Sequence, residues 1–263
     1  MHNIFGRLSA SRRFIAIIAA SALLVFALYA CSGAKPAKRP IIGLMTTLPL
    51  QWQEGDIGDV IGAKGAASPT FSRINARFET RPIDNLSPQS LSGISALMLA
   101  QSRALSPTEL NDLDHWVRGG GKLLLFADPA LHWESIYPLG DKRRPMFTTL
   151  LSPLFAHWGL ELVLPIAQGD EKYQTFLING KTIQTVTAGA WQIITGGKAE
   201  CAIAKVSIVA NCNIGEGSAI LVADADLLDA DLWQGTGIRA VFGTDDFANI
   251  AWTVAQLDAL TAK

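Results

Sequence analysis

The sequence predicts a three-layer α/β domain with a mostly parallel sheet and a β-rich insert, preceded by one N-terminal transmembrane helix. Three observations predict this fold. Apolar stretches of strand length recur along the chain and end in polar residues, as buried parallel strands do. Two of these stretches flank a strongly capped helix through short connections, which is the pattern of a βαβ unit. Residues 14–30 form an uninterrupted apolar run near the N-terminus.

This apolar run is the predicted membrane anchor. It carries no charge, and Cys31 to Ala34 extend it to a length that spans a bilayer. Arginines precede it, which is typical of a bacterial export signal or signal anchor. We therefore expect a single-pass protein of the bacterial inner membrane with its domain in the periplasm. The expected parts are a basic flank at 1–13, an anchor or signal segment at 14–34, a linker at 35–40 and an α/β domain at 41–263.

Orientation and processing of this segment stay open at the level of sequence. Leu28 to Cys31 resembles a bacterial lipobox, in which Cys31 would be lipidated and become the mature N-terminus. A lipoprotein is thus the main alternative to an uncleaved anchor, and simple cleavage is the third. Charge counting does not fix the orientation, because three basic residues stand on each side: Arg7, Arg12 and Arg13 before the run, and Lys35, Lys38 and Arg39 after it.

The first part of the domain is predicted to contain parallel strands around one helix. Ser106, Pro107 and Glu109 supply an N-cap, the preferred first-turn proline and a capping box. The helix that starts there ends at Gly119–Gly121, because glycine accepts the left-handed conformation. The crossover that it makes should be right-handed. Strands are predicted at Ile41–Met45, Ala76–Ile83, Ala96–Ala100 and Lys122–Ala127, with a mobile loop at Gly55–Ser68.

The second part is predicted to hold the insert and to close the fold. A helix is expected over Met146–Leu160, kinked or split by Pro153. Tyr173–Ile194 alternates around Asn179-Gly180, which is a hairpin signal and predicts antiparallel strands. A core strand at Ala219–Ala223 follows. The last helix is expected over Asp246–Leu260, with a buried face made of Phe247, Ile250, Ala251, Val254 and Leu257.

Cys201 and Cys212 flank a short apolar stretch. At that spacing a disulfide would join the two arms of a hairpin if the compartment is oxidising. The alternative is a pair of reduced cysteines buried as small hydrophobic residues. No metal site is expected, because the sequence has no CxxC pair and its four histidines are scattered.

Polar residues that end the predicted strands are the candidate ligand-binding residues. In an open parallel sheet, ligands bind at the carboxyl ends of the strands. Trp52 and Glu54 lie in the loop after the first strand and would line the same crevice. Each aspartate has an alternative role, which is to cap the turn after its strand. The strand-end residues are Thr46, Thr47, Asp128, Asp224 and Asp226.

Composition and motifs argue against catalysis and nucleic-acid binding. With 22 basic and 23 acidic residues, the net charge is -1, so no field attracts nucleic acid. No Gly-x-Ser-x-Gly elbow occurs, and the glycine-rich stretches precede strands rather than helices, so we expect no nucleophile and no cofactor. A non-catalytic binding or scaffolding domain is predicted, with a small polar ligand as a candidate occupant of the crevice. The alternative is a hydrolase that uses Asp128, Asp224 or Asp226.

Three segments resemble one protein family. Ala96–Pro129, Gly215–Leu228 (GEGSAILVADADLL) and Asp245–Leu257 (DDFANIAWTVAQL) are similar to the soluble domain of auxiliary subunits of gliding-motility-type ABC transporters. The resemblance implies a class I glutamine amidotransferase-like, flavodoxin-like fold on a membrane anchor, beside an ABC permease and ATPase. It does not imply amidotransferase activity, because Gln101-Ser102 stands where true amidotransferases have their nucleophilic cysteine.

Overall fold

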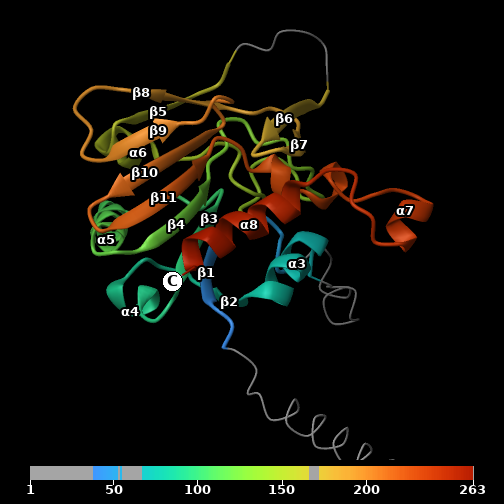
Figure 1. The fold of residues 1–263 in the computed structure, drawn as a ribbon, viewed down its shortest axis with the longest axis horizontal. Coiled ribbons are helices and arrows are strands. Elements are labelled where there is room, and N and C mark those ends of the chain that lie inside the picture. The colour runs from blue at the N-terminus through green and yellow to red at the C-terminus, as the bar shows by residue number, and fades with distance from the viewer. Residues whose placement is uncertain (1–37, 53, 55–66, 166–171, 263) are drawn as a thin grey trace, which may run out of the picture. The chain divides into compact units, whose positions relative to one another are not determined.

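The computed structural model describes residues 38–52, 54, 67–165 and 172–262, and Arg39–Lys263 form one compact unit (Figure 1). The predicted anchor, its basic flank and Cys31 lie outside the described residues, as does most of the predicted loop at Gly55–Ser68. Among the residues that are described, no helix combines the length and the apolar content needed to cross a bilayer. The anchor therefore stays a prediction from the sequence.

A seven-stranded mixed sheet forms the centre of the domain. Its strands are β1 (Ile41–Thr46), β2 (Glu79–Pro82), β3 (Ala96–Ala100), β4 (Lys122–Phe126), β9 (Glu200–Ile203), β10 (Val209–Ile214) and β11 (Gly217–Val222). They lie in the order β2-β1-β3-β4-β11-β10-β9. The first five strands in this order are parallel to one another, which confirms the predicted mostly parallel sheet. At one edge, β10 pairs antiparallel with β11 and β9 pairs antiparallel with β10.

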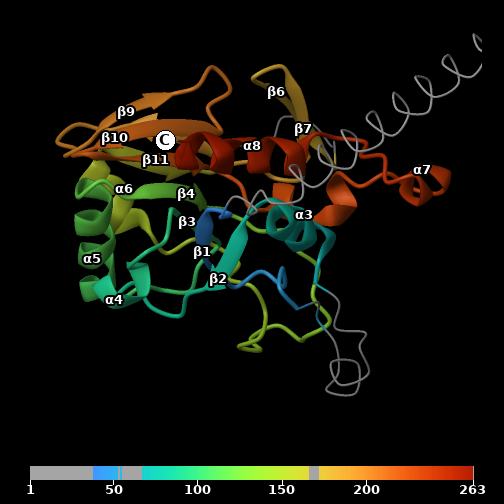
Figure 2. The same cartoon turned by 60° about the horizontal axis from the view of Figure 1, so that its bottom comes forward.

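Helices cover the sheet and account for its apolar strands. Helix α8 (Asn249–Thr261) packs on β3 and β4, and α3 (Pro69–Arg77) lies beside α8 (Figures 1 and 2). Helix α5 (Pro107–Arg118) packs against β11. Every residue of β3 is buried, as expected for a strand that is covered on both faces.

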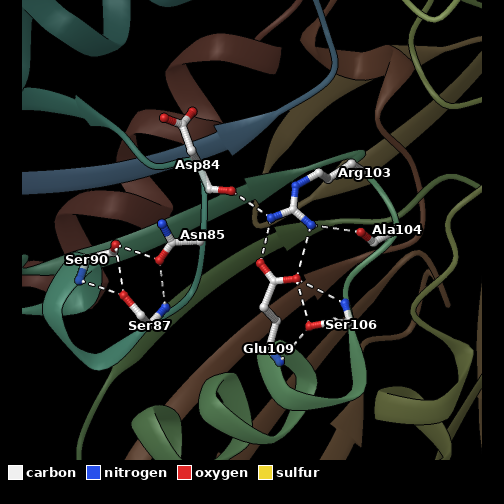
Figure 3. A network of polar contacts seen from close by, with 8 residues as sticks. All are labelled: Asp84, Asn85, Ser87, Ser90, Arg103, Ala104, Ser106 and Glu109. Carbon is white, nitrogen blue, oxygen red and sulfur yellow. Dashed lines mark hydrogen bonds and ion pairs between the residues drawn. The ribbon is translucent and has the colours of Figure 1, made fainter.

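The capped helix predicted between β3 and β4 is confirmed. Ser106 and Glu109 form the capping box, in which each side chain accepts a hydrogen bond from the other residue's backbone N–H. Arg103 donates to both carboxylate oxygens of Glu109, at 3.1 and 2.5 Å, and to the carbonyl of Asp84 at 2.6 Å (Figure 3). Glu109 therefore fixes the helix start and, through Arg103, the loop that follows β2.

Ser-Pro pairs at helix starts explain where the predicted elements differ from the structure. The strand predicted at Ala76–Ile83 is wrong in its first half, because Ser68 caps α3 with Pro69 in its first turn and the helix continues to Arg77. Helix α4 (Pro88–Leu91) begins in the same way after Ser87. Pro153 also lies in a first turn, so it begins the short α6 (Ser152–Trp158) and does not kink a longer helix.

The β-rich insert contains two small antiparallel sheets. Strands β6 (Gln174–Ile178) and β7 (Lys181–Thr185) form the predicted hairpin, whose turn residues Asn179 and Gly180 have φ of 50° and 75°. The predicted antiparallel pairing of the insert is confirmed, although its last strand does not join the hairpin. Strand β8 (Ala190–Ile193) pairs instead with β5 (Leu160–Val163).

The last helix starts three residues later than predicted, and its buried face differs in part. Ile250 and Leu257 are buried as predicted, whereas Ala251 is exposed. Asn249 is buried at the helix start and donates hydrogen bonds to the carbonyls of Gln184 and Leu227. The polar Asn249 therefore joins α8 to the insert, a contact that apolar periodicity does not reveal.

The two cysteines lie opposite each other on β9 and β10. Cys201 and Cys212 are register partners, with Cα atoms 4.0 Å apart, and the structure joins them as a disulfide. The bond links the edge strand β9 to its neighbour. Formation of this bond in the native compartment stays a prediction.

Candidate functional site

Three predicted strand-end aspartates converge. Strands β4 and β11 are parallel neighbours in which Phe126 pairs with Val222, so Asp128 and Asp224 leave the sheet side by side. Because β11 ends at Val222, Asp224 and Asp226 both lie in the loop beyond the strand. One carboxylate oxygen from each aspartate lies within 4.8 Å of the others.

All three carboxylates are buried and accept hydrogen bonds from the domain itself. Asp128 accepts from the N–H groups of Ala130 (2.8 Å) and Ala225 (3.0 Å). The Asp224 carboxylate accepts from the Leu227 N–H (2.8 Å) and from the Thr185 hydroxyl. Both oxygens of Asp226 accept from the His132 N–H, at 3.1 and 3.0 Å. The aspartates thus tie together the loops after β4 and β11, and Thr185 of the insert.

Burial raises the pKa of each carboxyl group. It raises the pKa of Asp128 to about 6 and, together with repulsion from Asp128, the pKa of Asp226 to about 7. The pKa of Asp224 is raised well above its ordinary value, first by burial and then by the charges of the other two. The backbone N–H donors lower each pKa and only partly offset burial. Each carboxyl group of this aspartate triad therefore keeps its proton to a higher pH than an exposed aspartate does.

The triad offers oxygen ligands of the kind that a cation takes, and it also makes hydrogen bonds within the domain. Carboxylate oxygens are the ligands that Mg²⁺ and Ca²⁺ prefer, and these three residues offer one oxygen each. Every oxygen already accepts from a backbone N–H or a hydroxyl, and each keeps a second acceptor position. Asp128 and Asp224 are 0% exposed and Asp226 is 2% exposed, so no substrate reaches them without movement of the loops.

The predicted threonines lie at the strand ends but not in the triad. The Thr47 hydroxyl donates to the Gln101 carbonyl at 2.5 Å and accepts from the Met146 N–H at 3.1 Å. The Thr46 hydroxyl accepts from the Leu48 N–H. The chain order reverses between β1 and β3, where a doubly wound sheet usually opens a crevice, and the hydrogen bond from Thr47 to Gln101 crosses this position. A role of Thr46 and Thr47 in ligand binding stays a prediction.

Gln101 is the residue that sequence reasoning missed. It is fully buried and has a φ of 43°, which is unusual for a residue other than glycine. Its side chain accepts from the Asp128 N–H (2.9 Å) and donates to the carbonyls of Met146 (2.7 Å) and Asp128 (3.3 Å). An amide directly after a fully apolar strand was the available signal, since it can both donate and accept at a crowded strand end.

An open hollow of about 480 Å³ lies beside the buried triad. Trp133, Asp229 and Asp231 line it, and Trp133 directly follows His132, whose N–H binds Asp226. The predicted Glu54 also lines it and accepts hydrogen bonds from Ser135. Trp52 is 66% exposed and lies on the surface, so it does not join the triad. The triad therefore holds part of the wall of an accessible hollow.

Similar solved structures share little sequence with the chain. The mmIFT52 N-terminal domain is 12% identical with a TM-score of 0.48, and the match covers 85% of this chain and 98% of that one. The exo-beta-1,4-mannosidase Op5Man5 from Opitutaceae bacterium strain TAV5 is 13% identical with a TM-score of 0.45, and the match covers 83% of this chain and 36% of that one. A putative ThuA-like protein from Bacteroides uniformis ATCC 8492 is 12% identical with a TM-score of 0.40, and the match covers 88% of this chain and 96% of that one. A search of curated proteins finds no match.

One family profile matches the sequence directly. Its description is "ABC-type uncharacterized transport system", and it matches residues 39–191, which is more than half of the chain. The matched region includes Asp128 and ends before Asp224 and Asp226. This match confirms the resemblance to auxiliary ABC transporter proteins. The chain therefore belongs to the family of ABC-type uncharacterized transport system proteins, which are auxiliary components of such systems.

Proposed function

We propose that the chain is a non-catalytic binding or scaffolding domain that assists an ABC-type transport system from the periplasm, anchored in the bacterial inner membrane by residues 14–34. The observation that carries the proposal is the state of the aspartate triad. All of its carboxylate oxygens accept hydrogen bonds from within the domain. Carboxylates held in this way brace the loops around them, and their burial keeps a substrate away unless the loops move.

The finer description of the fold belongs to the same proposal. The parallel strands follow the order β2-β1-β3-β4-β11, which supports a doubly wound, flavodoxin-like sheet of the three-layer type, as in class I glutamine amidotransferases. The anchor is supported by the apolar run and its basic flank, with lipidation of Cys31 as the alternative. The expected partners are the ABC permease and ATPase subunits, and the strand-end hollow offers room for a small polar ligand.

One observation favours a second candidate function, which is a hydrolase. The pKa values of Asp128 and Asp226, about 6 and about 7, lie where a general acid is effective. Such an enzyme would need the loops over the triad to open, because the three carboxylates are buried.

The two functions are separated by a substrate screen with a matched variant. Wild-type protein and the Asp128→Asn variant are assayed with generic ester, phosphate, glycoside and amide substrates. We expect no turnover above buffer from either protein. Turnover by the wild type that disappears in a folded Asp128→Asn variant would replace the scaffolding proposal with the hydrolase.

A further inference from the structure

A structured arm between Gln234 and Asp246 extends from the domain. It contains the short helix α7 (Ile238–Val241), which stands away from the sheet in both views (Figures 1 and 2). Gln234 and Asp245 form a β-bridge at its base, and the Gly235 N–H donates to the Thr244 carbonyl at 3.0 Å. The two sides of the arm are thus joined where it leaves the fold.

Glycine makes the close approach at the base of the arm. A Cβ atom on Gly235 would lie 2.1 Å from the Thr244 carbonyl oxygen, so no other residue fits there without movement of the backbone. Two charged contacts hold the arm in place: Arg239 pairs with Asp246 at 2.8 Å, and Arg73 of α3 pairs with Asp245 at 3.0 Å. The arm therefore has a defined conformation at its base.

The arm presents two large apolar side chains to solvent. Ile238 is 73% exposed and Phe242 is 78% exposed. Burying a side chain of this size on binding is favourable, since each removes a large apolar area from water. An ordered segment that protrudes and exposes an aromatic and a branched aliphatic side chain is typical of a protein-contact site.

The base of the arm opens on the acidic hollow. Gln234 belongs to both, because it forms the β-bridge and lines the hollow. Among the described residues that line the hollow, four are acidic and none is Lys, Arg or His. Burial, and to a smaller extent repulsion from Asp231 and Glu134, raises the pKa of Asp229 to about 6. The four acidic residues are Glu54, Glu134, Asp229 and Asp231.

We propose that the arm and the hollow form one docking surface for a protein segment in which apolar side chains stand next to Lys or Arg, supplied by another subunit of the transport system. Charge complementarity selects this occupant: the apolar residues would cover Ile238 and Phe242 while the basic residues enter the hollow. An anionic membrane surface would be repelled by the same carboxylates. A second copy that docks symmetrically through the same surface would bring an equally acidic hollow, so that contact lacks the complementary charge. The inference rests on the proposed function, because it names the partner of that scaffold.

Site-specific photo-crosslinking in the full-length protein, in native membranes, tests the proposal. A photoreactive phenylalanine analogue replaces Phe242 in one variant and Ile238 in another. The matched control replaces Leu177 of β6, which is also apolar and 66% exposed. We expect adducts to a subunit of the transport system from positions 238 and 242 and none from position 177. Mass spectrometry should place them in a segment that contains Lys or Arg beside apolar residues.

The contribution of charge is tested in the same preparation. The double change Glu134→Lys and Asp231→Lys should lower the adduct from position 242 by about tenfold. Glu200→Lys, which reverses an exposed charge on β9, should leave the yield unchanged. An equal yield in the double variant would overturn the role of the hollow.

Each remaining outcome also decides the proposal. Co-purification of the transport subunits without adducts from 238 or 242 would overturn the docking surface and leave the proposed function intact. Absence of the subunits from the purified protein would instead count against the proposed function. Adducts only to lipid would assign the arm to the membrane, and adducts only to the same chain would assign it to self-association; both would overturn the proposal.

Discussion

Replacing Gln101 separates the two things that this residue does. Its side chain binds buried backbone groups of Asp128 and Met146, and its backbone adopts a φ of 43°. Gln101→Ala and Gln101→Gly remove the same hydrogen bonds, but only glycine adopts a positive φ without strain. The two variants therefore differ in backbone strain, while their losses of hydrogen bonding are equal.

The expected magnitudes follow from the contacts. Both variants leave the buried Asp128 N–H and Met146 carbonyl without the side chain that paired them, which costs about 2–4 kcal/mol of unfolding free energy. The left-handed conformation costs a residue with a Cβ atom about 1–2 kcal/mol. The unfolding free energy of Gln101→Gly should therefore be about 1 kcal/mol higher than that of Gln101→Ala. This reverses the usual order, in which alanine is the more stabilising of the two residues.

Urea denaturation of residues 39–263, which form one compact unit, measures this difference. Asn179 is a matched control, because it also has a positive φ but is exposed in a hairpin turn. Asn179→Gly should again be more stable than Asn179→Ala. Both variants should lose less unfolding free energy relative to wild type than the Gln101 variants do, because no buried hydrogen bonds are removed. A Gln101→Gly variant that is no more stable than Gln101→Ala would refute the inference that this strand end is strained.

The remaining predictions concern the triad, the disulfide and the topology. The pKa values of Asp128 and Asp226 are raised to about 6 and about 7, above their unfolded values, so these groups stabilise the fold most below about pH 4 and their contribution is lost as the pH rises to about 7. The urea midpoint should thus fall over this range in wild type and fall less in Asp224→Asn, which removes a repelling charge; a midpoint that rises instead contradicts the raised pKa values. Reduction of Cys201–Cys212 should cost about 2–3 kcal/mol of unfolding free energy, and non-reducing mass mapping of native protein should find the bond and not two free thiols. Alkaline phosphatase fused after Lys263 should be active; an inactive fusion beside a fluorescent green fluorescent protein fusion would place the domain in the cytoplasm.

Local signals in the sequence were sufficient for the βαβ unit. Ala96–Ala100 and Lys122–Phe126 are short apolar runs, which indicates strands. The cap at Ser106, Pro107 and Glu109 indicates that the segment between them is a helix. Helix α3 was missed because its own Ser-Pro cap follows a glycine-rich stretch and its apolar positions are few. Caps therefore carried more information here than periodicity.

The site was predictable as a place and not as a geometry. Strand-end aspartates were expected to meet, because parallel strands bring their carboxyl ends to one edge of a sheet. The loop contacts that Asp224 and Asp226 make depend on where β11 ends, and a sequence does not fix strand ends to within one residue. The contacts of Gln101 join residues up to 45 positions apart, which no local pattern encodes.

The central claim is that this family member assists a transporter without performing catalysis. The most direct measurement is purification of the full-length protein from native membranes, followed by mass spectrometry of the bound subunits and an assay of hydrolytic turnover in the same sample. We expect an ABC permease and ATPase in stoichiometric amounts, with no turnover that depends on Asp128. A protein that purifies alone and hydrolyses a substrate in an Asp128-dependent manner would contradict the account.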